Sequence, residues 1–295
     1  MRSAYIKTII NFRNIYIFII SMGTYILGGG IAHYVGANFH SYAFSLGLLW
    51  TICIVSAGHF LKIYFLPSAN FSEVDGMVEW IEKNRNFFLI LSSSLLVICG
   101  MVVAGQIILK ILSNVQIVLY SFSIMGFIGL LIPPYKMGEK GYQEIFLSIF
   151  QAGLTTALGY FSVFHYYQKI LIFVSFPLTC IALASIIAFG FSTYANDLKF
   201  GKKTFLTVIS WQKAIPIHNI LLIFAYIFFA SGVIFHFPVG LIWPALLTFP
   251  LGCLQVFWLI RIKNGGKPIW LFFNTLIASV YGLTVYFLAL TFWIK

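Results

Sequence analysis

The sequence consists of long apolar stretches separated by short polar loops. Nine stretches are long enough to cross a bilayer, for which an α-helix needs roughly 20 residues. They run from Phe12 to Tyr34, Ser41 to Phe65, Phe87 to Lys110, Ser113 to Ile132, Tyr142 to Phe164, Ile170 to Tyr194, His218 to Phe235, Val239 to Ile260 and Ile269 to Thr291. In lipid, every backbone N–H and C=O must be bonded internally, and continuous apolar runs achieve this as helices rather than as barrel strands. We therefore expect an all-α integral membrane protein with nine transmembrane helices, forming one polytopic domain over residues 1–295.

The composition agrees with this expectation and excludes other classes of protein. Hydrophobic residues make up 61% of the chain and charged residues only 8%, and the net charge is +11. A soluble nucleic-acid-binding protein of that charge would need a polar surface that this chain lacks. Anionic membrane lipid or an anionic substrate is therefore the expected partner, and nucleic acid is not. Four cysteines stand far apart inside apolar stretches, which is typical of small buried residues rather than of metal ligands.

The distribution of cations predicts the orientation in the membrane. The first apolar run, from Ile15 to Ala32, exceeds the roughly 7–15 residues of a signal-peptide core, so we expect it to be retained as a helix. Fifteen Lys and Arg residues fall on the side of the N-terminus, and three fall on the other side, namely Lys110, Lys169 and Lys295. By the positive-inside rule, the N-terminus and the motif loops face the cytoplasm. The expected location is the plasma membrane of a bacterium or an archaeon.

The acidic residues are concentrated in the same cytoplasmic loops. All seven lie in or beside the loops 66–86, 133–144 and 195–213: Glu73, Asp75, Glu79, Glu82, Glu139, Glu144 and Asp197. Loops held by a rigid scaffold commonly carry binding residues. One hypothesis is that the three loops build a single functional mouth, and the alternative is that charges merely avoid hydrocarbon.

Two motifs at the cytoplasmic surface resemble those of a known family. The fourth apolar run ends in GLLIPPYKMGEKGYQEIF, where Pro133 and Pro134 stop the helix. The sixth is followed by NDLKFGKKTFL, which places Asp197 before Gly201 and two lysines. Together with the nine predicted helices, these motifs resemble the UbiA superfamily of intramembrane prenyltransferases, and most of all its quinone-biosynthesis branch.

The resemblance implies a fold and an activity. The expected fold is a bundle of nine helices around a central, lipid-accessible cavity. The expected activity is transfer of a prenyl group from a prenyl diphosphate to an aromatic or lipid acceptor. In the family, two Asp-rich loops hold magnesium ions that neutralise the departing diphosphate. The resemblance also extends to Arg13 before the first helix, and to Gly23, Gly28, Gly29 and Gly30, which would allow close helix packing.

The chain departs from the family in the metal-binding motifs. At the end of the second run, Lys62, Ile63 and Leu66 stand where the family has an Asn and two Asp residues. In the second motif, Asp197 falls on the last Asp but Thr193 falls on the first. Only one aligned carboxylate therefore remains, and Leu130 stands where a family tyrosine is expected before the Pro-Pro.

Two solutions for binding a diphosphate stay open. One magnesium ion could be held by Asp197 together with Asp75 or Glu73, although the segment DGMVEWIEKNR, which begins at Asp75, is also typical of an interfacial amphipathic helix. Alternatively, Lys62 could supply the positive charge itself, since cationic side chains bind phosphate oxygens directly. The candidate substrate-binding residues are Lys62, Asp197, Lys202, Lys203, Lys199, Arg13 and Lys136. The competing interpretation is that these cations meet anionic lipid.

Two functions follow from these alternatives. The first is a UbiA-like prenyltransferase with an altered diphosphate site, for which the sequence assigns no catalytic residue. The second is a non-catalytic relative that binds an isoprenoid or a partner, since most Asp ligands are missing. A transporter is disfavoured because the central parts of the runs carry almost no ionisable residue. Among the six histidines, only His59 is a candidate cavity residue, and we favour a structural role for it.

Overall fold

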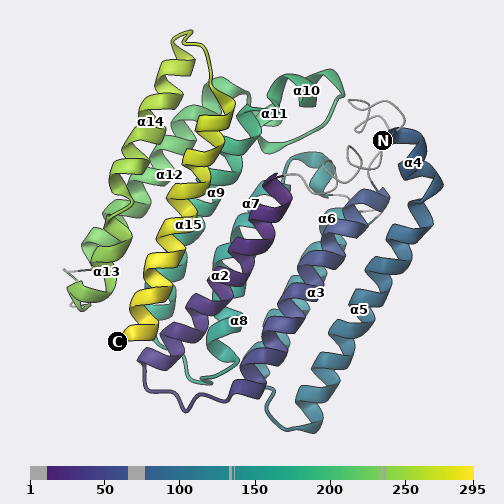
Figure 1. The fold of residues 1–295 in the computed structure, drawn as a ribbon, viewed down its shortest axis with the longest axis vertical. Coiled ribbons are helices and arrows are strands. Elements are labelled where there is room, and N and C mark those ends of the chain that lie inside the picture. Colours follow the sequence, from purple (N-terminus) through teal and green to yellow (C-terminus); the bar gives the residue numbers. More distant parts are fainter. Residues whose placement is uncertain (1–11, 66–76, 133–134, 136, 233, 235–236) are drawn as a thin grey trace.

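The computed structural model describes residues 12–65, 77–132, 135, 137–232, 234 and 237–295, and every regular element in these ranges is a helix (Figure 1). In chain order the helices are α2 (Phe12–Tyr34), α3 (Ser41–Phe65), α4 (Met77–Lys83), α5 (Arg85–Ile108), α6 (Asn114–Leu131), η2 (Met137–Lys140), α7 (Gln143–Ser148), η3 (Ile149–Leu154), α8 (Thr155–Phe161), α9 (Lys169–Phe191), α10 (Tyr194–Lys199), α11 (Phe205–Ile209), α12 (Trp211–Ser231), α13 (Val239–Leu246), α14 (Phe249–Lys263) and α15 (Trp270–Ile294). The predicted all-α class is confirmed for this part of the chain.

Eight helical segments of the described chain have the length and apolarity needed to cross a membrane. They correspond to eight of the nine predicted spans. The remaining span, from Tyr142 to Phe164, is the stretch in which α7, η3 and α8 follow one another without a gap. Because η3 is a π-helix, neither flanking helix reaches spanning length by itself. The integral membrane architecture is confirmed, whereas the count of nine spans stays a prediction.

Several predicted spans differ from the observed helices by up to three residues at an end, and two differ more. The seventh does not begin at His218, because α12 starts two turns earlier at Trp211 and continues through Pro216. The predicted start lies beyond this proline, a residue type that commonly interrupts helices. The eighth is divided into α13 and α14 near Thr248, and Pro250 occupies the first turn of α14, where its missing N–H costs nothing.

Close contact between α2 and α8 depends on two glycines. A Cβ atom on Gly28 would overlap the carbonyl oxygen of Thr156, and one on Gly159 would overlap that of Tyr25. The buried hydroxyls of Thr24 and Thr155 hydrogen-bond to each other across the contact between α2 and the start of α8, at 2.7 Å. This is the packing of small residues that joins helices in lipid. The predicted role of Gly28 is thus confirmed.

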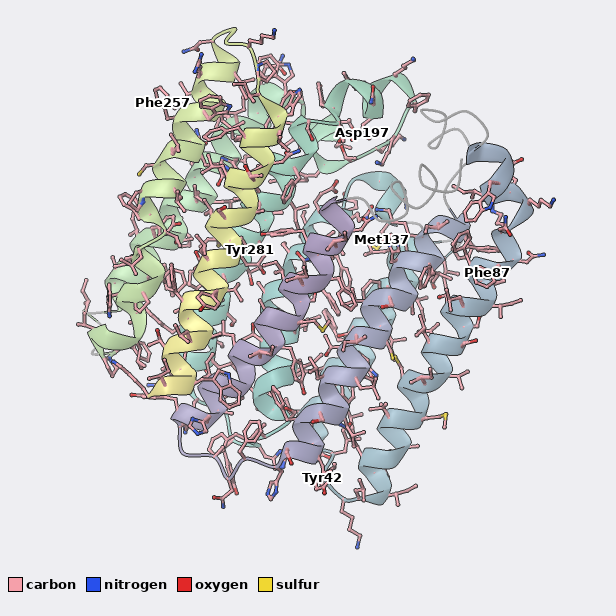
Figure 2. All side chains as sticks on the ribbon, viewed as in Figure 1. Tyr42, Phe87, Met137, Asp197, Phe257 and Tyr281 are labelled. Carbon is pink, nitrogen blue, oxygen red and sulfur yellow. The ribbon has the colours of Figure 1, made fainter. Side chains whose placement is uncertain are left out.

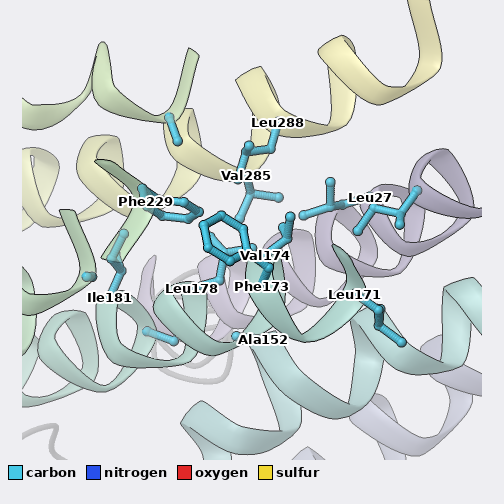
Figure 3. Packing of buried hydrophobic residues seen from close by; sticks show 14 of the residues in the cluster. Leu27, Ala152, Leu171, Phe173, Val174, Leu178, Ile181, Phe229, Val285 and Leu288 are labelled. Carbon is cyan, nitrogen blue, oxygen red and sulfur yellow. The ribbon is translucent and has the colours of Figure 1, made fainter. Parts of the chain in front are cut away.

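The core is centred on α9, which is buried along most of its length. Leu178 and Ile181 are fully buried there, and they pack with Phe229 of α12 and Leu288 of α15 (Figure 3). No charged residue lies in α9 after Lys169. Helix α9 can therefore be surrounded by other helices without burying a charge.

The described cations are gathered at one end of the bundle, called here the basic end. It carries the beginning of α2, the helices α4, α10 and α11, and the turn between α14 and α15 (Figure 1). All described Lys and Arg residues lie there except Lys110, Lys169 and Lys295. The predicted separation of the cations, most on one side and three on the other, is thus present in three dimensions. The side of the membrane that each end faces stays a prediction.

The segment predicted as an amphipathic helix within the loop 66–86 is helical in its described part. Helix α4 spans Met77–Lys83, and Ile81 is buried against Phe88 of α5 and Ile63 of α3. Arg85 Nε donates a 2.7 Å hydrogen bond to the carbonyl of Tyr64, which fixes the ends of α3 and α5 together. The location of α4 at the membrane interface stays a prediction, and Asp75 lies outside the described residues.

Candidate functional site

A cavity of about 300 Å³ lies among the helices of the N-terminal half, between α2, α3, α6 and the α7–η3 segment. We call it the apolar cavity, because Phe18, Phe127, Leu131 and Phe150 are typical of its lining. Its polar lining residues are few: Asn14, Ser56, His59, Lys62 and Gln143. All of them come from the parts of their helices nearest the basic end. The cavity thus combines an apolar interior with a cationic side chain, which suits a ligand with an apolar chain and an anionic head.

Helix α3 places three polar side chains in this lining. Ser56, His59 and Lys62 follow one another at intervals of three residues and so share one face of the helix. Gly58 allows the ring of Phe127 to pack against α3, since a Cβ there would lie 2.6 Å from that ring. His59, the histidine singled out as a candidate cavity residue, thus lines the cavity. Lys62, one turn further along the same face, also lines the cavity.

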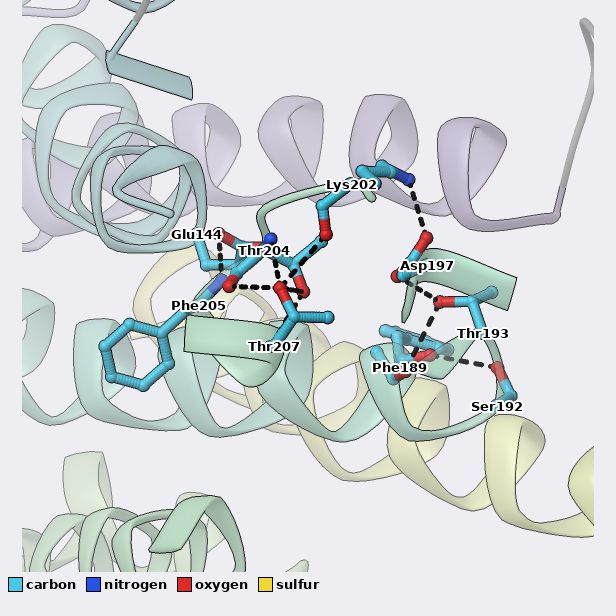
Figure 4. Close-up of polar contacts among 10 residues, drawn as sticks. Glu144, Phe189, Ser192, Thr193, Asp197, Lys202, Thr204, Phe205 and Thr207 are labelled. Carbon is cyan, nitrogen blue, oxygen red and sulfur yellow. Dashed lines mark hydrogen bonds and ion pairs between the residues drawn. The ribbon is translucent and has the colours of Figure 1, made fainter. Parts of the chain in front are cut away.

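The second motif is built around the buried carboxylate of Asp197. Lys202 Nζ donates to Asp197 Oδ1 at 3.1 Å, and Thr193 Oγ1 donates to Oδ2 at 3.0 Å (Figure 4). The backbone N–H of Lys202 also donates to the carbonyl of Asp197 at 2.8 Å, and Gly201 turns the chain with a φ of +63°. Asp197 is only 6% exposed. Both of its oxygens are therefore occupied by side chains close to it in the sequence.

Glu144 connects two of the three acidic loops. Its Oε2 accepts a 3.2 Å hydrogen bond from the backbone N–H of Phe205, at the start of α11 (Figure 4). Thr204 and Thr207 cap this helix reciprocally. The loops 133–144 and 195–213 therefore meet, as the single-mouth hypothesis predicted. The residues of the first loop before Met77 lie outside the described chain, so their part in that hypothesis is untested.

The other predicted binding residues are placed differently. Lys199 and Lys203 are exposed, and Lys199 Nζ lies 5.5 Å from the ring centroid of Phe200. Neither contributes to the apolar cavity. The side chains of Arg13 and Lys136 lie outside the described residues. The structure thus separates Lys62, at the cavity, from the pair formed by Lys202 and Asp197.

Comparison with known proteins identifies the fold. No protein-family model matches the chain, and no curated protein sequence matches it significantly. A UbiA homologue from Archaeoglobus fulgidus, bound to GPP and Mg²⁺, matches with a TM-score of 0.66 and 12% identity over 93% of this chain and 99% of that one. The chain has the UbiA fold. A UbiA homologue from the same organism bound to Cd²⁺ matches with a TM-score of 0.62 and 14% identity, over 92% of this chain and 97% of that one. One bound to DMAPP and Mg²⁺ matches with a TM-score of 0.60 and 12% identity, over 93% and 98%.

The UbiA fold raises the question of a magnesium site, and the described side chains do not fit one. Among them, no three His, Cys, Asp or Glu residues come together. Asp197 is already bound by Lys202 and Thr193, and Glu144 accepts a backbone N–H. Magnesium needs carboxylate oxygens that are available to it, usually from one or two residues. Among the residues that the structure describes, we therefore assign none as a magnesium ligand, and the predicted ligand Asp75 lies outside them.

Sequence reasoning missed the three neutral polar residues of the cavity. Asn14 and Gln143 lie near the ends of apolar runs, where polar residues are common and carry no signal by themselves, and Ser56 lies inside the run from Ser41 to Phe65. For Ser56, the three-residue spacing from His59 and Lys62 was a usable signal. Asn14 and Gln143 reach the same space only because α2 and α7 pack beside α3 and α6 in the UbiA fold.

Proposed function

We propose that this chain is a UbiA-type membrane prenyltransferase with an altered diphosphate site, in which lysine supplies the charge that binds the diphosphate. The observation that carries the proposal is Lys62 in the lining of the apolar cavity. UbiA homologues of the same fold bind GPP and DMAPP, which are prenyl diphosphates. The prenyl chain would occupy the apolar part of the cavity, and the diphosphate would lie at the basic end beside Lys62.

The chemistry required of the site is limited. In prenyl transfer, the bond between the allylic carbon and the diphosphate oxygen breaks, and its electron pair leaves with the diphosphate. The acceptor, an aromatic or lipid molecule, then gives an electron pair to the allylic carbon and loses a proton. A cation beside the leaving oxygens stabilises the negative charge that develops there. In our proposal Lys62 provides this stabilisation, and the apolar lining excludes water from the allylic cation.

A second candidate is an isoprenoid-binding protein without transferase activity. The ion pair of Asp197 and Lys202 favours it, because the one carboxylate that aligns with the family motifs is already neutralised. In either case, the remaining cations of the basic end would meet anionic lipid of the inner leaflet. A role in quinone biosynthesis requires prenyl transfer, so it applies only to the prenyltransferase and not to the binding protein.

Binding of GPP to the purified protein in lipid nanodiscs tests the proposal, with Mg²⁺ and again with EDTA. We expect wild type to bind GPP under both conditions. Lys62→Ala should weaken binding about tenfold or more, as loss of a charge-assisted contact does. Lys295→Ala, at the opposite end, is the matched control and should bind as wild type does.

Two results would contradict this proposal. Absence of GPP binding under both conditions would exclude a prenyl diphosphate site. Binding that requires Mg²⁺ and is unaffected by Lys62→Ala would exclude the lysine site. Release of diphosphate from bound GPP, measured with an aromatic acceptor present, separates the transferase from the second candidate.

A further inference from the structure

A second, much smaller space lies beside the apolar cavity, between α2, α7–η3, α9 and α15. It has a volume of about 10 Å³, and we call it the polar chamber. Its polar lining residues are Tyr16, Gln143, Glu144, Gln151, Ser185 and Tyr281. It shares Ile17, Gln143 and Leu147 with the apolar cavity. The two spaces are therefore adjacent.

Two hydroxyls of the chamber have no hydrogen-bond partner in the described structure. Ser185 and Tyr281 are both 0% exposed, and neither Ser185 Oγ nor the Tyr281 hydroxyl is paired. By comparison, the buried hydroxyls of Thr155 and Thr284 each donate to the carbonyl four residues earlier, at 2.7 and 2.6 Å. Leaving a buried polar group unpaired is unfavourable. Two such groups at one chamber, from helices α9 and α15 that are far apart in the sequence, indicate that a ligand atom pairs with them.

The size and charge of the chamber limit what that atom can be. A space of this volume holds about one water molecule, or one oxygen atom of a larger ligand whose body lies in the neighbouring cavity. Among the lining side chains that the structure describes, only Glu144 is charged, and it is acidic. A carboxylate in the lining disfavours an anionic group and favours a neutral hydroxyl, which can both donate and accept.

We propose that Ser185 and Tyr281 bind the hydroxyl of a neutral phenol or alcohol, and that this molecule is the prenyl acceptor. The apolar body of the acceptor would then extend into the apolar cavity, toward the proposed prenyl site. The role of this ligand as the prenyl acceptor rests on the proposed function. The binding of its hydroxyl rests only on the two unpaired hydroxyls of the polar chamber.

The test uses two probes that differ in charge, 1-naphthol and 1-hydroxy-2-naphthoate, with the full chain in nanodiscs. We expect 1-naphthol to bind more tightly than the naphthoate. Ser185→Ala and Tyr281→Phe should each weaken 1-naphthol binding about threefold to tenfold, the effect of one lost neutral hydrogen bond. Tyr226→Phe is the matched control, because the Tyr226 hydroxyl pairs with Thr248 at 2.9 Å, away from the chamber. It should leave 1-naphthol affinity unchanged.

Thermal unfolding without a ligand separates recognition from a structural role. Because the Tyr281 and Ser185 hydroxyls are unpaired, Tyr281→Phe and Ser185→Ala should be at least as stable as wild type. Tyr226→Phe should unfold at a lower temperature, since it loses a buried hydrogen bond.

GPP binding on the same samples distinguishes failure of the two proposals. If GPP binds but 1-naphthol does not, or if both chamber variants bind 1-naphthol as wild type does, the acceptor site is wrong and the prenyl diphosphate site stands. Tighter binding of the naphthoate would also overturn the acceptor site. If 1-naphthol binds through the two hydroxyls but GPP does not bind, the chamber is supported and the transferase proposal fails.

Discussion

At the scale of single residues, the environment of Asp197 makes a sharp prediction. Its side chain is 8% exposed and that of Lys202 is 30% exposed, so the carboxylate has little access to water and Lys202 is its ion-pair partner among the described residues. Lys202→Met would leave a buried carboxylate without its counter-charge. We expect a loss of about 2 kcal/mol in the free energy of unfolding, somewhat less than for a fully buried pair. Chemical denaturation of the purified protein would measure it.

The double variant Asp197→Asn/Lys202→Met provides the control. It removes both charges while Thr193 can still donate to residue 197. We expect it to recover much of the stability that Lys202→Met loses. Equal losses in the single and double variants would mean that the ion pair does not matter to stability.

At the scale of helices, the contact between α2 and α8 tolerates no side chain at position 28. An alanine Cβ at Gly28 would clash with backbone, which cannot rotate away, so the two helices must separate. Gly28→Ala should therefore destabilise the protein by about 1–3 kcal/mol, as overpacking does. Thermal unfolding in detergent is the measurement.

Helix α5 offers a matched control for this change. Gly100 and Gly105 have no atom within 4 Å of an added Cβ, so alanine there fills open space. Gly100→Ala and Gly105→Ala should be neutral or stabilising by up to about 1 kcal/mol, because alanine has the higher helix propensity. A similar loss at all three positions would attribute the effect to glycine in helices generally and not to the contact between α2 and α8.

At the scale of the whole molecule, the gathering of cations predicts which end faces the cytoplasm. Lys203 lies at the basic end, and Lys110 lies in the turn between α5 and α6 at the other end (Figure 2 shows side chains at both ends). In a Cys253→Ser background, Lys203→Cys should react with a membrane-impermeant maleimide only in inside-out vesicles, and Lys110→Cys only in right-side-out ones. Reaction of both from one side would refute the orientation.

Some of the site was predictable from spacing. His59 and Lys62 share a helix face with Ser56. The acidic residues suggested, as one of two alternatives, that three loops meet, and the bond between Glu144 and Phe205 joins two of them. Binding of substrate by Lys62, Lys202 and Asp197 stays a prediction. The pairing of Asp197 with Lys202 and Thr193 was not predicted, because it depends on the turn at Gly201.

The sequence by itself determined the helical membrane architecture, the segregation of cations and the likeness to the UbiA fold. The first two follow from run length, from loop composition and from the need of every backbone group for a partner in lipid, which are local properties. Only the tertiary structure decided which residues line the apolar cavity and that Ser185 and Tyr281, from α9 and α15, meet at one chamber. The physical reason is that helices apolar on every face carry no periodic signal of which face is buried. Their rotation about their own axes is set by packing against their neighbours.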